Sequence, residues 1–575
     1  MRRSFWQDYR ICYHLIVLYL VIGWFHWAFV LVPAKPDEIQ HLTYVAEVRR
    51  GDVWPIRSPA TETPCGLDER WQPPLYYWIS ALAVGPTVAP WPGEWVVPNP
   101  FFLVGAPRGN AVQCLHFPIG TPLLMAGRIW SWLLGTLAVC GAYRGARSWM
   151  GPPGAALTAL LATTLPSVIF YQTGVGNTAL FIPMNTLALA ELAWIWRKGL
   201  STRRLLRLSA LVVATVYARL EGLFLLPLLA LLFVREARSG FPTRRMLIAA
   251  LGILLALSPM FLRNLLVYGD PLVRSGLAVR GESRDPMTWL RLEGPMFFRA
   301  VFISLGHAWL FGEEWMYWAI RIAGLIGGMG IARRLGRGDL PSIAWVLIAY
   351  TGLFLATVVH ASLQHLIGGP RYVGSIGFAW LSLWTTGYLG WWPRSARRAG
   401  VVLGLIAVYG LSVAVISRVL LPAYMPQPAP RSDPPLARIA GKIILHRAVI
   451  EPSQARPGDV VTIRLVWEAL EPIPQNYAVF VHALDPHEDR ILAQEDTFPM
   501  YGHYPTMLWK PLQPFEEVHR LRLPDSLNVP RVRFTVGLYR YETGERAPAF
   551  SPAGVRFREG GGDAVPIGWI VIENR

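Results

Sequence analysis

Long apolar stretches alternate with short polar and basic segments through residues 1–420. A helix that crosses a hydrocarbon core of about 30 Å needs about 20 apolar residues at 1.5 Å of rise each. Nine stretches meet or approach this length, and each predicts one membrane span. They are Ile11–Val32, Arg128–Tyr143, Pro153–Tyr171, Ala179–Trp196, Met246–Val267, Trp315–Ile331, Leu340–Val359, Tyr372–Trp391 and Ala399–Leu420.

A tenth apolar stretch, Leu205–Val234, is too long for one span and carries Arg219 and Glu221 at its middle. An unpaired charge at the depth of the bilayer centre is costly. The stretch therefore predicts a hairpin of two short helices with these charges at its turn. The total is then about eleven spans.

The formal net charge is +17, which in a soluble protein would suggest nucleic acid as a partner. Here the basic residues cluster between the spans, at 2–10, 144–147, 197–207, 235–245, 333–337 and 394–398. Because Lys and Arg collect in cytoplasmic loops, we expect a multi-pass protein of the cytoplasmic membrane with a cytoplasmic N-terminus and no nucleic-acid partner. Eleven spans put all the basic clusters on one side. Pro73–Val88 is therefore expected to lie at the outer interface instead of spanning.

The period of the pattern changes after a proline-rich linker over residues 421–436. Short β-branched and aromatic runs, such as Val460–Trp467 and Val532–Tyr539, are separated by Pro, Gly and Asp turns. This pattern is typical of an all-β sandwich, expected over residues 437–575 on the extracytoplasmic side. Trp509 and Tyr504 could stack on sugars or pack in its core, and both alternatives stay open. The fold class is thus an all-α polytopic membrane domain over 1–420 plus a β-sandwich.

The first outer loop, residues 33–127, is long and carries clustered ionisable residues. The apolar run before it is longer than a typical signal-peptide core and lacks a clear cleavage site, so we expect it to be retained as a span. Cys65 and Cys114 both lie in this loop, where the compartment permits a disulfide, and two unpaired thiols are the alternative.

The loop opens with Asp37, Glu38 and His41, a few residues after the first span. Glu38–Arg50 has the pattern of an amphipathic helix, with Asp37 near its N-cap and His41 one turn along. A capped interfacial helix and a catalytic carboxylate explain this segment equally well from the residues alone.

Downstream motifs resemble those of the GT-C glycosyltransferases, in the branch akin to protein O-mannosyltransferases and the lipid A aminoarabinose transferase. The resemblance covers residues 1–420 and lies in the order of its motifs. These are the acidic pair after the first span, a Gly-x-x-x-Pro from Gly51 to Pro55, Glu69 before Gln72-Pro-Pro-Leu-Tyr-Tyr77, Arg263-Asn264 with Tyr268-Gly-Asp-Pro271, the segment Gly306–Trp315, and Arg371-Tyr372. Similar β-domains, with a Pro-Gly-Asp turn and a Phe480-Val-His482 strand, are fused to some members of the family.

The resemblance implies transfer of a sugar, with inversion, from a polyprenyl-phosphate donor to a hydroxyl of a glycan, lipid or protein acceptor. The acceptor hydroxyl needs a base, and Asp37 is the candidate, with Glu38 orienting the acceptor or holding a cation. The leaving phosphate needs positive charge, for which Arg263 and Arg371 are candidates, although both could be lipid-facing anchors. The expected substrate-binding residues are His41, Glu69, Gln72, Asn264 and Tyr372. The lipid tail would lie between spans, among membrane lipids.

Two departures from the family pattern bear on metal binding and on the fourth span. Trp71 stands where relatives carry an acidic residue suspected of metal binding, which puts a divalent cation (Mg, Mn or Zn) in doubt. Glu69 and His307 are the remaining candidate ligands, and a lone His is more often a hydrogen-bonded interfacial residue. Asn177-Thr178 replaces the Asn-Asp pair of many relatives, so one polar contact there is expected to be lost or replaced.

Two other functions compete with the enzyme. A non-catalytic assembly protein could use the same scaffold and would tolerate loss of Asp37. A transporter of lipid-linked glycans would place ionisable residues at mid-membrane. Apart from Arg219 and Glu221, the ionisable residues here lie near the ends of spans, which disfavours transport.

Overall fold

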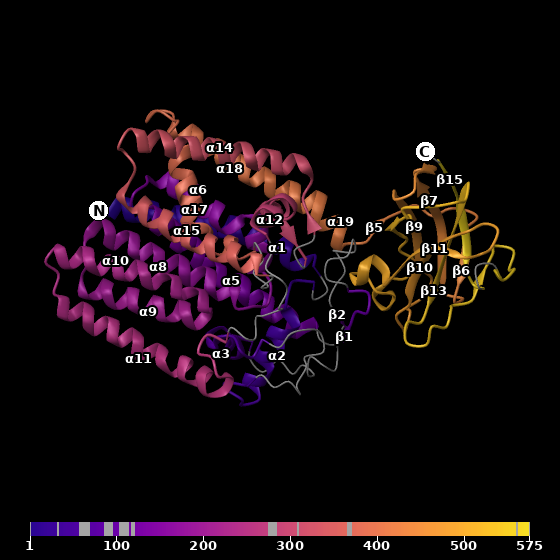
Figure 1. Cartoon of the computed structure of the whole chain (residues 1–575), viewed down its shortest axis with the longest axis horizontal. Coiled ribbons are helices and arrows are strands. Elements are labelled where there is room, and N and C mark those ends of the chain that lie inside the picture. The colour runs from indigo at the N-terminus through magenta and orange to yellow at the C-terminus, as the bar shows by residue number, and fades with distance from the viewer. Residues whose placement is uncertain are drawn as a thin grey trace. The chain divides into compact units, whose positions relative to one another are not determined.

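The computed structural model describes residues 2–30, 34–56, 69–84, 96–102, 114–116, 121–273, 285–306, 310–364, 371–558 and 562–573. The chain divides into two compact units. One comprises Met1–Phe29, Pro33–Val97 and His116–Leu420, and the other comprises Val30–Val32, Pro98–Leu115 and Leu421–Arg575 (Figure 1).

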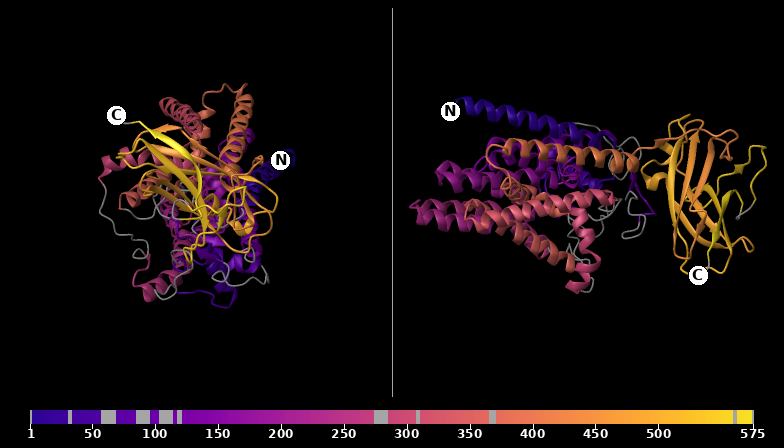
Figure 2. Two further views of the ribbon diagram at one scale, coloured as in Figure 1. Left: turned by 90° about the vertical axis from the view of Figure 1, so that its right-hand side faces the viewer. Right: turned by 90° about the horizontal axis from the view of Figure 1, so that it is seen from above.

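The first unit is a bundle of helices, and Figure 2 shows its long helices running side by side. Its helices are α1 (Arg2–Ala28), α2 (Glu38–Arg49), α3 (Leu75–Ala83), α5 (Thr121–Ala146), α6 (Pro152–Thr164), α7 (Pro166–Gln172), α8 (Thr178–Lys198), α9 (Thr202–Ala218), α10 (Leu225–Arg238), α11 (Thr243–Tyr268), α12 (Pro286–Leu292), α13 (Gly294–Phe302), α14 (Glu314–Gly336), α15 (Ser342–Leu363), α16 (Arg371–Ser375), α17 (Gly377–Tyr388) and α18 (Arg397–Val415). The two-stranded pair β3 (Ser304–Leu305) and β4 (Leu310–Phe311) lies between α13 and α14.

Seven helices within the described ranges are long and apolar enough to cross a membrane. The bent pair α6 and α7, which turns by 63°, adds an eighth if it forms one span. The predicted multi-pass helical domain is therefore confirmed, but the count of eleven is not. The number of long helices is smaller than the number of predicted spans because three of the predicted spans contain shorter helices. These are α9, α10 and α17, with 17, 14 and 12 residues.

The helical hairpin predicted over Leu205–Val234 is present. Helix α9 ends at Ala218, the 3₁₀ turn Leu220–Phe224 follows, and α10 runs back from Leu225. Arg219 and Glu221 lie at the turn, as expected, and form an ion pair of 2.6 Å. Helix α3 has nine residues, too few to span the bilayer, which agrees with the prediction for Pro73–Val88.

The second unit contains two packed β-sheets. The strand order is β11-β10-β13-β15-β8 in one sheet and β14-β6-β7-β9-β12-β5 in the other. The strands are β5 (Gln427–Pro428), β6 (Ala437–Ile439), β7 (Ile443–Glu451), β8 (Gln454–Ala455), β9 (Val460–Ala469), β10 (Ala478–Leu484), β11 (Ile491–Thr497), β12 (Phe515–Arg522), β13 (Arg531–Tyr539), β14 (Ala549–Phe550) and β15 (Val565–Ile572).

The core of this unit settles the role of its aromatic residues. Trp509 and Tyr504 are 3% and 6% exposed, and both belong to the hydrophobic core around Trp467. They are core packing residues and present no ring face for stacking on a sugar. Part of the predicted linker also pairs with the sandwich, because β5 forms the edge next to β12.

A buried histidine on β12 lies between two carboxylates. His519 is 1% exposed, and its Nδ1 and Nε2 lie 3.3 Å from Glu495 and Glu517, respectively. Burial alone would lower the pKa of His519, but the charges of Glu517 and Glu495 raise it to about 10. The imidazolium thus compensates two buried carboxylates near neutral pH.

We expect His519→Gln to destabilise the β-sandwich by about 3 kcal/mol, because it leaves buried carboxylates uncompensated. The raised pKa makes the contribution of the imidazolium complete below about pH 6.5. The contribution declines above that pH and is lost as the pH passes about 10. Hydrogen exchange of β12 in the full-length protein, compared between wild type and variant across this range, measures it. His487→Gln, at an exposed position, is the control, and a difference that persists unchanged above pH 10 would contradict this assignment.

Candidate active site

The two ends of the helical unit differ in chemistry. At one end, basic side chains connect neighbouring helices, as in Arg147 with Asp8 and Arg245 with Thr202. Asp37, which directly precedes α2, and Arg219, which follows the last residue of α9, belong to the opposite end. The basic clusters are therefore segregated from the candidate site, as the sequence predicts.

A small cavity of about 40 Å³ brings together several of the expected site residues. Asp37, His41 and Tyr372 line it, although they are far apart in the sequence. Arg219 also lines this cavity. The remaining lining residues are Lys35, Pro36, Tyr171, Gly174, Val175, Gly176 and Thr178. A carboxylate, an imidazole and a guanidinium thus border one space at the end of the bundle.

Asp37 adopts a backbone conformation that is unusual for a residue other than glycine. Its φ and ψ are 62° and 13°, in the left-handed region, and its side chain makes no capping hydrogen bond to α2. The side chain of Asp37 therefore does not cap α2, which was the alternative explanation for an Asp at this position. Asp and Asn adopt this region more readily than other residues with a side chain, and residues held there recur at functional sites.

The residue after Asp37, Glu38, is held by a buried ion pair. Its side chain is buried and accepts two hydrogen bonds from Arg128, at 2.8 Å to Nε and 2.6 Å to Nη2. The backbone N–H groups of Lys35 and Val175 donate to the same carboxylate. Burial would raise the pKa of Glu38, but the charge and hydrogen bonds of Arg128 bring it below its ordinary value.

These contacts correct the part expected for Glu38. A carboxylate whose oxygens are filled by a buried guanidinium and two backbone donors is not placed to orient an acceptor or hold a cation. We assign Glu38 a positioning role, because it ties the start of α2 to α5 through Arg128 and to the segment before α8 through Val175. Asp37 lies next to this anchor.

The segment between α7 and α8 forms one wall of the cavity and has no room for larger residues. A Cβ atom on Gly174 would lie 2.8 Å from Lys35 Cδ, and one on Gly176 would lie 3.0 Å from His41 Cδ2. The ammonium of Lys35 also donates to the backbone and side-chain oxygens of Thr173, both at 2.7 Å. Glycine at these two positions allows the backbone to approach the residues that border the cavity.

His41 and the aromatic residues of α3 form a packed layer beneath the cavity. His41 Nδ1 lies 2.8 Å from the hydroxyl of Tyr77, whose ring stacks on Tyr44 at 3.6 Å between centroids. The hydroxyl of Tyr76 lies 2.8 Å from Ser131 Oγ and accepts from the backbone N–H of Gly176. The Tyr-Tyr pair of α3 therefore fixes both the histidine and the glycine-containing wall.

Arg219 is held by polar groups from two elements, the start of α8 and the 3₁₀ turn that follows α9. Its Nη1 donates to Asn177 Oδ1 at 2.8 Å and to Thr178 Oγ1 at 3.0 Å, and its Nη2 donates to Glu221. The guanidinium also lies 5.0 Å from the centroid of the Tyr372 ring. Asn177-Thr178 therefore keeps polar contacts at the start of α8, here with an arginine.

Two of the expected substrate-binding residues, Glu69 and Gln72, contact Arg219 indirectly, through Asn177. Gln72 donates to Glu69 at 2.8 Å and accepts from Asn177 Nδ2 at 3.0 Å. Glu69, Gln72, Asn177 and Arg219 thus form a continuous chain of hydrogen bonds. Gln72 and Glu69 do not line the cavity.

Of the two arginines expected to bind phosphate, the structure describes the side chain of Arg263 alone. Arg263 does not line the cavity, and its Nη2 donates to the carbonyl oxygens of Trp54 and Pro55. Its neighbour Asn264 is buried and donates to the carbonyl of Pro271. Arg371 begins α16, and its side chain, like His307 and Cys65, lies outside the described residues.

Whether Glu69 and His307, the expected metal ligands, come together stays a prediction, because His307 lies outside the described residues. No group of three His, Cys, Asp or Glu side chains suited to a metal ion occurs in the part of the chain that is described, and the Glu69 carboxylate is bonded to Gln72. We derive no step through a divalent cation. Cys114 is disulfide-bonded while Cys12 and Cys140 are free, so the pairing with Cys65 stays a prediction.

The sequence motifs missed two features of the site. Arg219 was assigned to a hairpin turn only, although a charge within a long apolar stretch is itself a signal of function. The wall at residues 173–177 was missed because its two glycines match no phosphate-binding pattern. A signal for this wall was available in the sequence, because Gly174 and Gly176 lie just before Asn177 at the start of a predicted helix.

Solved structures with a similar course of the chain are all distant. ArnT from Cupriavidus metallidurans matches with a TM-score of 0.41 and 14% identity over 73% of this chain and 74% of that one. The oligosaccharyltransferase AglB from Archaeoglobus fulgidus matches with a TM-score of 0.43 and 12% identity over 71% and 55%. A protein O-mannosyltransferase complex from S. cerevisiae matches with a TM-score of 0.33 and 17% identity over 48% and 35%.

No protein-family model matches the chain, and no curated protein matches it by sequence. At such TM-scores and identities, the function proposed for this chain rests on the residues of its own site.

We expect Glu38→Gln to lower the stability of the helical unit by about 3–5 kcal/mol, because it leaves the buried guanidinium of Arg128 without a counter-charge. The double variant with Arg128→Met should lose less than the sum of the two single variants. Thermal unfolding of the full-length protein in detergent measures both. Asp8→Asn breaks the partly exposed pair with Arg147 and should cost about 1 kcal/mol or less. Additive losses at Glu38 and Arg128 would show that the pair is not coupled.

Proposed function

We propose that this chain is an integral membrane glycosyltransferase that moves a sugar from a polyprenyl-phosphate donor to an acceptor hydroxyl, with inversion, at the outer face of the cytoplasmic membrane. The observation that carries the proposal is Asp37, which has a left-handed backbone conformation and makes no side-chain capping hydrogen bond to α2. It borders the same cavity as Arg219 and Tyr372. The donor class comes from the resemblance of the sequence motifs to GT-C enzymes.

In the proposed reaction, Asp37 takes the proton of the acceptor hydroxyl. The acceptor oxygen forms a bond to the anomeric carbon as the bond from that carbon to the phosphate oxygen breaks. Attack on the face opposite the phosphate inverts the anomeric carbon, and the phosphate leaves on the carrier lipid with the bonding electron pair. A phosphate is stable as an anion, so a strong general acid is not required.

The leaving phosphate gains charge as the bond breaks, and a cation beside it lowers the barrier. Arg219 is our candidate because its guanidinium borders the cavity, whereas Arg263 is bonded to backbone carbonyls elsewhere. Asn177, Thr178 and Glu221 fix the orientation of Arg219 before any substrate binds. A cation held in place in this way needs little reorganisation during the reaction. Arg371 stays a candidate for a second phosphate contact.

The remaining expected residues fall into supporting roles. His41 and Tyr372 border the cavity and are placed to contact the sugar or the acceptor. Glu69 and Gln72 hold Asn177, which in turn holds Arg219. The acceptor, whether a glycan, a lipid or a protein, needs to present only a hydroxyl to Asp37.

A non-catalytic assembly protein is the main competitor, and it differs in one testable respect. Such a protein needs the anchor formed by Glu38 and Arg128 but has no use for the carboxylate of Asp37. The carboxylate at this position favours the enzyme, because Asn or Gly would adopt the left-handed conformation at least as readily but would supply no base.

We expect Asp37→Asn to lower sugar transfer by about 10²–10⁴-fold, the range for loss of a general base. Asn keeps the shape and tolerates the left-handed conformation, so the fold should remain. Transfer of radiolabelled sugar from several polyprenyl-phosphate donors into membrane acceptors, at matched protein levels, measures the change. Asp52→Asn, at an exposed position three residues after the end of α2, is the matched control. Equal transfer by wild type and Asp37→Asn would rule out Asp37 as the base, and no transfer by either with any donor would favour the assembly protein.

We expect Arg219→Gln to lower kcat by about 100-fold or more, the effect of removing one fixed donor to a developing anion. Arg219→Lys should retain part of the rate, since it keeps the charge but loses the planar fork. Arg263→Gln should change kcat by less than about tenfold, because its contacts anchor a loop. If Arg263→Gln lowers kcat more than Arg219→Gln does, in variants with the same unfolding temperature, then Arg263 and not Arg219 is the residue that binds the leaving phosphate.

A further inference from the structure

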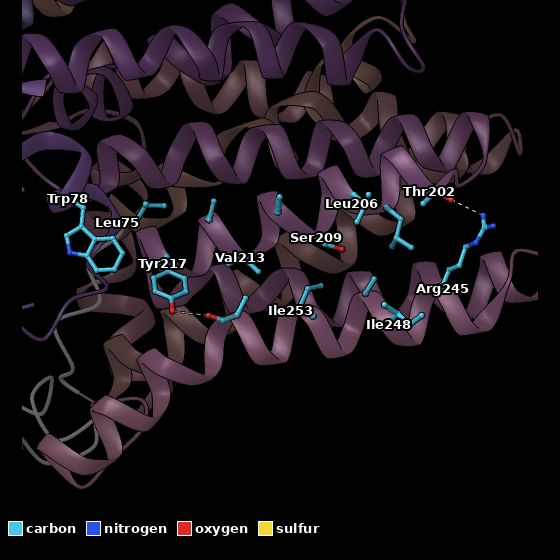
Figure 3. Close-up of a pocket in the computed structure, with 16 residues that line it drawn as sticks. Leu75, Trp78, Thr202, Leu206, Ser209, Val213, Tyr217, Arg245, Ile248 and Ile253 are labelled. Carbon is cyan, nitrogen blue, oxygen red and sulfur yellow. Dashed lines mark hydrogen bonds between the residues drawn. The ribbon is translucent and has the colours of Figure 1, made fainter. Parts of the chain in front are cut away.

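A long apolar groove, separate from the cavity of the candidate active site, runs between α9 and α11 in the helical unit (Figure 3). Its volume is about 840 Å³, and aliphatic side chains such as Leu205, Val213 and Ile253 make up most of its wall. The 17 residues of α9 rise about 25 Å, most of the thickness of a hydrocarbon core. The groove is therefore long and apolar enough for a lipid chain lying along the helices.

The two ends of the groove differ in charge. At one end, Arg245 Nη1 donates to Thr202 Oγ1 at 2.9 Å, and this exposed guanidinium borders the groove (Figure 3). More arginines lie close by in sequence on the first turns of the same two helices: Arg203, Arg204 and Arg207 on α9 and Arg244 on α11.

At the other end the polar atoms are already bonded to the protein. The hydroxyl of Tyr217 donates to the carbonyl of Ala256 at 2.9 Å, and Trp78 Nε1 donates to the carbonyl of Val53 at 2.6 Å. Neither Tyr217 nor Trp78 brings a charge, and Leu75 completes this end. The groove thus has one cationic end and one neutral end.

We propose that this groove binds one anionic phospholipid. Its phosphate lies at Arg245 and Thr202, and one acyl chain follows the groove toward Trp78. The guanidinium supplies charge and paired donors for a phosphate, and the apolar wall takes the chain. A carrier lipid with its phosphate at the Asp37 end would place its charge where no cation lines the groove. The charge distribution therefore favours a phospholipid from the leaflet on the arginine side.

The proposed site is independent of sugar transfer, but it adjoins the active site through α9. This helix forms one wall of the groove and ends at Ala218, directly before Arg219. A lipid packed along α9 would support the helix that carries Arg219 to the cavity.

Gly252 offers a way to fill the groove without disturbing the fold. It lines the groove on α11, and a Cβ atom added there meets no other atom within 4 Å. Gly352 on α15 has the same open surroundings but lies outside the groove. Gly252→Leu and Gly352→Leu are therefore a matched pair, and Arg245→Gln pairs with Arg398→Gln at the start of α18.

The experiment is native mass spectrometry of the full-length protein taken from vesicles of phosphatidylcholine and phosphatidylglycerol, followed by titration with each lipid. Wild type should retain one phosphatidylglycerol more tightly than phosphatidylcholine. Gly252→Leu should weaken this binding about tenfold or more, the effect of losing roughly two buried methylenes. Arg245→Gln should weaken phosphatidylglycerol binding about fivefold, the effect of one arginine near an anionic headgroup, and leave phosphatidylcholine unchanged. The two control variants should match wild type.

Equal binding by Gly252→Leu and Gly352→Leu would overturn the groove as the site. Equal loss with Arg245→Gln and Arg398→Gln would overturn the placement of the phosphate. Displacement of the retained phosphatidylglycerol by an equimolar polyprenyl phosphate would identify the carrier lipid as the occupant and overturn the proposal. None of these measurements depends on sugar transfer, so failure of the lipid site and failure of the enzymatic function are distinguishable.

Discussion

The candidate site depends on one buried ion pair. Glu38 and Arg128 are both essentially inaccessible, and the pair joins the start of α2 to α5. Removing two charges from water is expensive, and their attraction compensates only when the remaining hydrogen bonds are made. Here both oxygens of Glu38 are filled, by Arg128 and by backbone donors from Lys35 and Val175. The main effect of the pair is therefore to fix where the start of α2 lies relative to α5, and its net contribution to stability is small.

Asp37 lies directly before this anchor. It has a left-handed backbone conformation and makes no capping hydrogen bond to α2. The opposite wall is equally constrained, because Gly174 and Gly176 lie too close to Lys35 and His41 for a side chain. Both walls of the cavity are thus held by groups that do not react. Asp37 itself lines this cavity.

Much of the fold could be predicted from hydrophobic pattern, and part of the site from motif order. The hairpin turn at Arg219 and the β-rich C-terminal unit follow from where charges and short β-branched runs occur. The number of spans does not, because α9, α10 and α17 are shorter than a full span and periodicity cannot show how such helices pack. Asp37, His41 and Tyr372 were predicted as site residues and line one cavity, whereas Glu38 was expected to orient the acceptor or hold a cation. Adjacent carboxylates look alike in a sequence, and only burial against Arg128 distinguishes the two.

Arg219 shows why a charge was retained in a long apolar segment. Its placement at the end of α9 requires a break in that segment, and the hairpin keeps both helices too short for ordinary spans. At this position the guanidinium donates hydrogen bonds to Asn177, Thr178 and Glu221. It also lies over the ring of Tyr372, so it borders the cavity in a fixed orientation. A buried guanidinium needs polar partners in any role. What suits Arg219 to stabilise an anion is its place on the cavity that Asp37 also lines, and α9 links this cavity to the apolar groove along its side.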